Sequence, residues 1–136
     1  MALPKLRTYN VLASFNNVNN YLNKPISFLL RKFYIKTKIG TLGLRIETGQ
    51  YQKLKEAERI CLECQMNSVE DTLHFCIICP KHITLRNILF SYVTCDNFVN
   101  MCDLDKLKYL FSEPSLMKPV ANFIMNAFYN RDQSQT

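Results

Sequence analysis

Four cysteines and one histidine lie within nineteen residues near the middle of this chain, and this cluster limits the fold more than any other feature. Residues 1–7 contain no apolar stretch of signal-peptide length, so we expect an intracellular protein, in the cytoplasm or nucleus, whose thiols stay reduced. Reduced, clustered cysteines beside a histidine are typical of zinc sites. The residues concerned are Cys61, Cys64, His74, Cys76 and Cys79.

The first two cysteines form a C-x2-C pair, which lets two thiolates of one tight turn reach the same ion. A tetrahedral zinc ion needs two further ligands, and the sequence offers more than one completion. A chain without metal, with buried thiols and a core histidine, is the remaining interpretation. The candidate completions are His74 with Cys79, Cys76 with Cys79, and Cys79 with His82.

Local sequence signals bear on this choice. Ser68 followed by Asp71 resembles a capping box, which predicts a short helix from about residue 69 that carries His74. Pro80 disfavours helical geometry at Cys79, so this helix is expected to end there.

The end of that helix matters because five helical residues would leave His74 and Cys79 roughly 140° apart. A break after the helix can bring the two side chains to the same side, whereas Cys76 would point into the core. We therefore favour Cys61, Cys64, His74 and Cys79 as the ligands of one zinc ion. Because side chains fill all four positions, the expected role of the metal is structural and not catalytic.

Length and composition indicate a single domain of 136 residues, with 48% hydrophobic residues available for a core. We divide it into a basic helical part at about 1–55, a zinc clip at about 59–80 and a helical part at about 80–131. The longest apolar runs are too short to cross a membrane, so no membrane partner is expected.

Hydrophobic periodicity predicts a mainly helical fold with little or no sheet. Around Leu29, Leu30 and Phe33, a helix is predicted over about 25–38, with Pro25 near its start and Gly40 after its end. Residues 41–51 are predicted to be extended or looped. Further helices are predicted at about 80–93, at 103–112 with Asp103 as N-cap, and at 116–130.

Charge is distributed unevenly along the chain. Residues 1–55 carry ten Lys and Arg residues against one acidic residue, a net +9, which suggests a polyanionic partner. Residues 56–79 carry five acidic residues against one arginine, so this segment should repel phosphate. We therefore expect the zinc clip to stabilise the fold and not to bind nucleic acid. The residues predicted to contact RNA or DNA are therefore Arg31, Lys32, Lys36, Lys38 and Arg45.

The clip and its surroundings resemble the zinc-binding C-terminal domain of non-LTR retrotransposon (LINE-like) reverse transcriptases. The resemblance rests on the C-x2-C pair followed by Val69-Glu70-Asp71-x-x-His74, Cys79-Pro80 and Arg86, together with Ile46-Glu47-Thr48-Gly49 and the closing segment 120–131. It extends over about residues 3–131. The resemblance implies the same four zinc ligands and a role in binding nucleic acid during reverse transcription.

No Tyr/Phe-x-Asp-Asp motif occurs in the chain, and no carboxylate–lysine arrangement suggests a nuclease, so we expect no enzymatic activity and no small-molecule substrate. The first functional hypothesis is a zinc-stabilised nucleic-acid-binding module. The alternative is a structural or protein-interaction domain that docks on a reverse transcriptase polymerase domain, with an exposed apolar stripe on helix 116–130, or a non-functional remnant of an element.

Overall fold

A computed structural model of the chain describes residues 27–135, with side-chain environments up to Arg131. Residues 1–26, which include the expected helix start near Pro25, lie outside the described residues. The helical elements are α2 (Phe28–Ile39), α3 (Arg45–Thr48), η2 (Gly49–Gln52), η3 (Glu56–Glu58), η4 (His74–Ile78), η5 (Pro80–His82), α4 (Ile83–Phe90), η6 (Phe98–Asn100), α5 (Asp103–Ser112), η7 (Pro114–Leu116) and α6 (Met117–Gln135).

The described residues are mostly helical and form no sheet, which confirms the predicted fold class. Their strand-like pairing is limited to an isolated antiparallel bridge between Ile60 and Val69. No described helix combines the length and the apolar character that crossing a bilayer would require.

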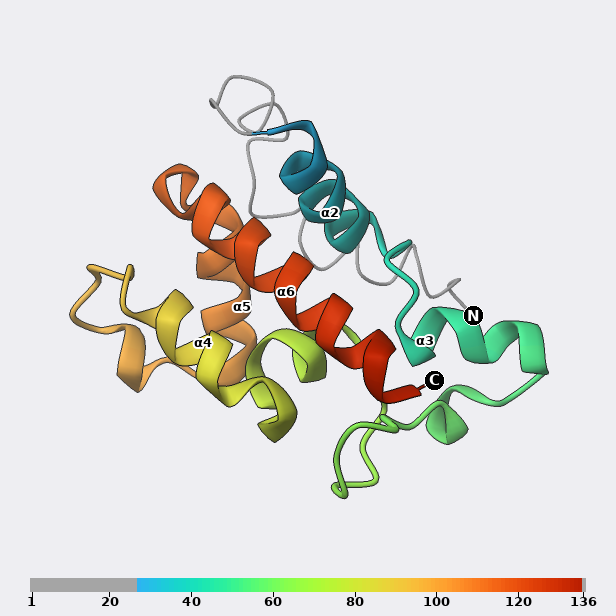
Figure 1. The fold of residues 1–136 in the computed structure, drawn as a ribbon. Helices are drawn as coiled ribbons and strands as arrows, with labels where there is room; N and C mark the ends of the chain where they lie inside the picture. The colour runs from blue at the N-terminus through green and yellow to red at the C-terminus, as the bar shows by residue number, and fades with distance from the viewer. Residues whose placement is uncertain (1–26, 136) are drawn as a thin grey trace.

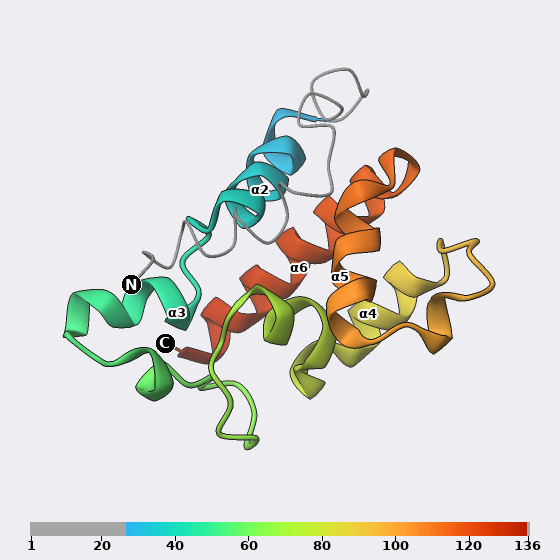
Figure 2. The same ribbon diagram turned by 180° about the vertical axis from the view of Figure 1, so that it is seen from behind.

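Helix α6 runs through the middle of the fold (Figure 1). Helices α2 and α4 pack along different sides of it, and α5 lies against it in the reverse view (Figure 2). The apolar face of α6 is buried among these helices as part of the core, so the described part of α6 lacks the exposed stripe on 116–130 that the protein-docking alternative implied. Its buried residues include Val120, Ala121, Phe123, Ile124 and Ala127.

Helix α2 has clear local signals at both ends. The Ser27 hydroxyl accepts a hydrogen bond from the Leu30 N–H, and Gly40 ends the helix in the left-handed conformation at φ 77°. The prediction that Leu30 and Phe33 are buried is confirmed, whereas Leu29 is partly exposed.

The buried face of α2 extends further round the helix than the sequence suggested. Tyr34 is buried, and its hydroxyl donates a hydrogen bond to the Phe111 carbonyl of α5. Lys38 lies one turn after Tyr34, on the same face, and is only 4% exposed. Lys38, which was predicted to contact RNA or DNA, therefore does not lie on the exposed surface of α2.

The segment 41–51, predicted to be extended or looped, is mostly helical. The Glu47 carboxylate accepts hydrogen bonds from the N–H groups of Gly43 and Leu44, and so caps the start of its own short helix α3. Ile46, in the same turn, is completely buried. The short helix was missed because four residues are too few for helical periodicity to show, and its stability comes from the Glu47 cap and the burial of Ile46.

The helices after the clip agree with prediction in place but differ at their ends. The predicted helix 80–93 is divided into η5 and the shorter α4. Helix α5 begins at Asp103, but its N-cap is Cys102, whose side chain forms no cap hydrogen bond. Asp103 and Asp105 lie in the first turn of α5, where acidic side chains interact favourably with the helix dipole.

Candidate metal centre

Three thiols and one imidazole come together in the structure. The Sγ atoms of Cys61, Cys64 and Cys79 and a ring nitrogen of His74 all lie within 4.8 Å of one another. Cys61 Sγ lies 3.9 Å from Cys79 Sγ, and Cys64 Sγ lies 3.4 Å from His74 Nε2. We call these four residues the Cys3His cluster. They could hold a metal ion, and they are the set that the sequence favoured.

A wide helical turn, η4, brings the two distant members of the Cys3His cluster together. The Cys79 N–H donates a 2.7 Å hydrogen bond to the His74 carbonyl five residues earlier, which is the π-helical pattern. This wider turn replaces the clean helix break that the sequence suggested. The backbone at Cys79 then becomes extended, at ψ 121°, as expected before Pro80.

The cap of this turn differs from the predicted one. The Asp71 carboxylate accepts a hydrogen bond from the His74 N–H at 2.9 Å, so Asp71 is the capping residue. Ser68 instead donates a 3.5 Å hydrogen bond to the Met66 carbonyl, and the predicted Ser68 capping box is wrong. Asp71 thereby fixes the backbone of the histidine that belongs to the Cys3His cluster.

The other two members come from a tight loop. The Cys61 N–H donates to the Ser68 carbonyl at 2.8 Å, next to the Ile60–Val69 bridge, and closes the loop. Inside it, the Glu63 N–H points to Cys61 Sγ at 3.4 Å. Asn67 adopts a left-handed backbone at φ 55°, which asparagine tolerates better than most residues. We call residues 59–79 the knuckle.

Neither alternative ligand joins the cluster. Cys76 is buried in the hydrophobic core, as predicted, and burial raises the pKa of its thiol to about 12. His82 is buried with its ring edge-on to Phe75 and Phe123. Desolvation, aided by the positive charge of Arg86, lowers the pKa of His82 to about 4, so its ring is neutral.

The thiols of the cluster affect one another. The pKa of Cys61 is raised to about 12, chiefly by its hydrogen bond with Cys79 and also by burial. The pKa of Cys79 is lowered by the same hydrogen bond. A cation bound by the cluster would replace thiol protons, because metals bind cysteine as the thiolate.

Arg86 of α4 supports the turn from the other side. Its guanidinium donates to the carbonyls of Cys76 at 2.9 Å and Cys79 at 2.7 Å, and the side chain is buried. These two carbonyls lie at the end of η4, where the chain leaves the helix and the orphan carbonyls need donors. Arg86 therefore fixes the position of the last cluster member from the adjoining helix.

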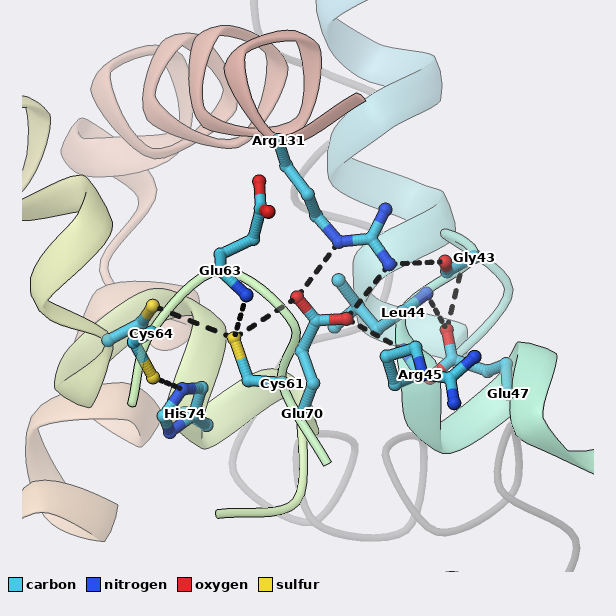
Figure 3. Close-up of polar contacts among 11 residues, drawn as sticks. Gly43, Leu44, Arg45, Glu47, Cys61, Glu63, Cys64, Glu70, His74 and Arg131 are labelled. Atoms are coloured by element: carbon cyan, nitrogen blue, oxygen red, sulfur yellow. Dashed lines mark hydrogen bonds and ion pairs between the residues drawn. The ribbon is translucent and has the colours of Figure 1, made fainter. Parts of the chain in front are cut away.

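A buried ion pair lies on the other side of Cys61. The Arg131 guanidinium, at the end of α6, contacts both carboxylate oxygens of Glu70 at 2.8 and 2.9 Å (Figure 3). The Arg45 N–H donates to the same carboxylate at 2.8 Å, and Cys61 Sγ lies 3.9 Å from it. The close-up shows Glu70 between Arg131 and Cys61. The carboxylate thus links the knuckle to α3 and to the last helix.

Arg59 forms a second structural link. Its buried guanidinium donates to the carbonyls of Ile46 and Leu54 at 2.9 to 3.1 Å. Its aliphatic stem passes over Gly49 so closely that a Cβ on that glycine would lie 2.4 Å from Arg59 Cγ. Gly49 is therefore required for close approach. The Ile46-Glu47-Thr48-Gly49 segment packs against the base of the knuckle through these contacts.

The residues predicted to bind nucleic acid are placed differently from one another. Lys32 of α2 is exposed, and Arg31, Lys36 and Arg45 are half-buried. The Arg45 guanidinium also donates to the Gln52 side chain at 3.3 Å. Lys38 is buried, and burial lowers the pKa of its amine. The exposed cationic surface of α2 is thus centred on Lys32 and does not include Lys38.

Comparison of the chain with protein-family models, with curated proteins and with solved structures finds no match.

Proposed function

We propose that this chain is a zinc-binding module that binds single-stranded or double-stranded nucleic acid. The observation that carries the metal part is the convergence of the four side chains of the Cys3His cluster. Zinc bonds of about 2.3 Å to sulfur and about 2.0 Å to nitrogen, arranged as a tetrahedron, place ligand atoms roughly 3.5 to 3.8 Å apart. The S···S distance of 3.9 Å and the S···N distance of 3.4 Å are close to these values.

The donor set supports zinc over the harder cations. Three thiolates and one imidazole are typical of structural zinc sites, whereas calcium and magnesium bind oxygen ligands. With four side chains as ligands, no coordination position is left for a substrate. We therefore assign the metal a structural role, in which it fixes the knuckle.

The nucleic-acid part is supported by the cations that stay accessible and by the resemblance to the tail of retrotransposon reverse transcriptases. Lys32 is exposed on α2, and Phe28 at the start of the same helix is 83% exposed. Cations beside an exposed aromatic ring suit a strand with phosphates and stacked bases. The side chains of Arg31 and Lys36 add charge to this surface.

The surface of the knuckle suits phosphate less well. Glu63 is half-buried on the knuckle, and in η3, directly before it, Glu58 is exposed and Glu56 is half-buried. Glu70 does not contribute to this acidic surface, because it is buried and paired with Arg131. We therefore propose that nucleic acid meets α2 and that the knuckle stabilises the fold.

Metal content tests the first part. We expect one zinc per chain by mass spectrometry, lost in His74→Ala. Cys76→Ala is the matched control, because Cys76 lies two residues away on η4 and is buried outside the cluster. Zinc that survives His74→Ala, or that leaves with Cys76→Ala, would contradict the ligand assignment.

Salt dependence tests the second part. The affinity for a short RNA or DNA strand should fall steeply as salt rises, in proportion to the phosphates contacted. The double variant Lys32→Gln/Lys36→Gln should reduce the slope by about two counterions. The exposed Lys55, which precedes η3, provides the control Lys55→Gln, with an unchanged slope expected. An identical slope in wild type and in the double variant would contradict binding at α2.

One observation favours docking on a polymerase domain as a second candidate function. Ile83 and Ile88 of α4 and Tyr92 after it are each more than half exposed. Apolar side chains on one helix are typical of a surface that contacts another protein. Such docking would be nearly insensitive to salt, which distinguishes it from binding to phosphate.

A further inference from the structure

A groove lies between α4 and α6, away from the Cys3His cluster. Its volume is about 450 Å³, which is within the range of roughly 300 to 1,000 Å³ that is common for ligand pockets. Helices α4 and α6 lie side by side here, with α2 on a different side of α6 (Figures 1 and 2). The groove is therefore a surface separate from the cations of α2.

The wall formed by α6 carries a row of polar side chains. Lys118, Asn122 and Asn126 line the groove at four-residue intervals, so they follow one another at a spacing of about 6 Å along one helix face. Each asparagine amide offers both a donor and an acceptor, the combination that reads the edge of a nucleobase. Lys118 adds a positive charge at one end of the row.

The opposite wall is apolar and ends in an aromatic ring. Leu85, Ile88 and Leu89 of α4 line it, and Tyr92, which follows α4, has 58% of its surface exposed. Pro119 and Phe123 extend the apolar lining on the α6 side. A flat ring placed in this groove would have apolar or aromatic contacts on its faces and amides at its edge.

The charges around the groove favour a ligand with one negative group. No carboxylate lines it, and Lys118 is its one charged lining residue within the described part of the chain. The lining residue Ser115 is already bonded to a carboxylate, because Glu113 accepts from the Ser115 hydroxyl at 3.0 Å and from the Ser115 N–H at 3.3 Å. These bonds occupy Ser115, so Lys118 is the residue left to meet a phosphate.

We propose that this groove holds one unpaired nucleotide of a single-stranded RNA or DNA. Its base lies between the α4 wall and the Asn122–Asn126 row, Tyr92 stacks on it, and its phosphate lies at Lys118. The inference rests on the proposed function, because the groove would bind a base of the same strand whose phosphates contact α2. It also makes unpaired nucleic acid the preferred form, because a base inside a duplex cannot enter the groove.

The test compares two strands of equal charge. The zinc-loaded chain is titrated by fluorescence anisotropy with a labelled ten-nucleotide oligouridine or oligothymidine, and with a ten-residue abasic strand that carries the same phosphates. We expect the strand with bases to bind roughly 10-fold more tightly, since one stacked base contributes that much. Because Phe28 of α2 is a second exposed ring that can stack on a base, the variants are made in a Phe28→Ala background. In that background, Tyr92→Ala should remove the difference and leave affinity for the abasic strand unchanged, and Tyr92→Phe should retain the difference.

Matched variants separate the groove from the rest of the surface. Asn126→Ala should reduce the preference for bases, whereas Tyr51→Ala, which removes an 87% exposed tyrosine on η2, should not. Equal binding of the two strands by wild type would overturn the groove proposal and leave salt-dependent binding at α2 intact. A preference that survives both Tyr92→Ala and Asn126→Ala would overturn it as well.

If neither strand binds, the proposed function fails, and the groove is then tested alone. In that case, uridine and adenosine monophosphates are titrated into the labelled protein by nuclear magnetic resonance. Shifts of the Asn122 and Asn126 side-chain amides that Tyr92→Ala abolishes would support a nucleotide groove. The absence of such shifts at millimolar nucleotide would overturn it.

Discussion

The knuckle and the helices that surround α6 are stabilised in different ways. The interior of the helical part is aliphatic and aromatic, and Leu110, Phe111, Phe123 and Ile124 are all at most 3% exposed. The interior of the knuckle is largely polar, because thiols, an imidazole and the Glu70 carboxylate occupy it. Hydrophobic burial can hold the first region together, whereas the second needs partners for groups that are unfavourable to bury.

The η4 turn joins the two regions because its two faces differ. His74 and Cys79 face the cluster, while Phe75 and Ile77 are buried in the hydrophobic core. The packing of η4 on the core therefore fixes the positions of two of the four proposed ligands. The helical core therefore fixes the position of the knuckle, whereas its internal order depends on the buried charges and on the metal ion that we propose the Cys3His cluster holds.

Removal of the metal should have the largest effect. Structural zinc contributes on the order of 10 kcal/mol to the folding of small zinc domains, so chelation or Cys61→Ser should unfold the knuckle. Because the segment between Cys61 and Asp71 is not helical, we expect far-ultraviolet circular dichroism to change little. Hydrogen exchange should show loss of protection at the amides of Cys61 and Glu70 and retention in α6.

The outcome also tests how separate the two regions are. If chelation abolishes the helical signal as well, the helical core does not stay folded without the knuckle, and the two regions unfold as one cooperative unit. If chelation changes neither dichroism nor exchange, no metal is bound and the zinc proposal is wrong.

The next largest effect should come from Arg131→Met. This change leaves the Glu70 carboxylate buried without its partner, which typically costs about 3 to 5 kcal/mol of folding free energy. The double variant Glu70→Gln/Arg131→Met should recover a large part of the loss, because no unpaired charge then remains. Urea denaturation of the zinc-loaded proteins measures the free energy of unfolding of the single and the double variant. A double variant no more stable than the single one would contradict the charge argument.

These two regions also differ in how far the sequence could predict them. The four side chains of the Cys3His cluster were predictable, because three of them lie close to a tight turn or a proline whose geometry is local. The Glu70–Arg131 pair was not, because its members lie 61 residues apart and no local pattern joins them. Asp71 was misassigned because Ser68, three residues before it, matches the capping-box spacing, whereas the helical turn begins after Asp71, whose own carboxylate accepts from the His74 N–H.

The error at Lys38 has a physical cause of the same kind. Helical periodicity placed the buried face of α2 around Leu30 and Phe33, and both residues are buried. The Tyr34 hydroxyl, however, reaches the Phe111 carbonyl in α5, and this long-range contact extends the buried face by one row. Lys38, four residues after Tyr34, is buried with it.

A pH-dependent effect of intermediate size is expected at Glu47. Burial raises the pKa of this carboxyl to about 7, with a smaller contribution from the charge of Glu70. A folded-state pKa above the unfolded value of 4.5 means that this group stabilises the fold below about pH 4.5. That contribution is lost as the pH rises through 7.

Glu47→Gln should therefore stabilise the protein above pH 7, by on the order of 2 kcal/mol, and should have little effect near pH 5. The amide oxygen can still accept from the N–H groups of Gly43 and Leu44, so the cap of α3 is retained. Comparing the denaturation of variant and wild type at the same pH separates the contribution of Glu47 ionisation from any effect of metal release. A stability difference that does not change between pH 5 and pH 8 would rule out the raised pKa.

The smallest expected effect comes from two helix caps, one in each region, in which a side-chain oxygen accepts a hydrogen bond from the N–H group three residues later. Ser27 caps α2 by accepting from Leu30, and Asp71 caps the η4 turn by accepting from His74. Loss of either cap should lower stability by about 1 kcal/mol, so Ser27→Ala and Asp71→Ala should shift the denaturation midpoint similarly. Only the second cap holds a proposed ligand.

Asp71→Ala should therefore also weaken zinc binding, by roughly 10-fold, as is typical when a group that orients a ligand is removed. Ser27→Ala should leave zinc affinity unchanged. Competition with a chromophoric chelator measures both affinities in the folded proteins. Equal zinc affinities in the two variants would mean that the His74 backbone is held by the hydrophobic core through Phe75 and not by its cap. The knuckle would then depend on the helices even more than the present contacts indicate.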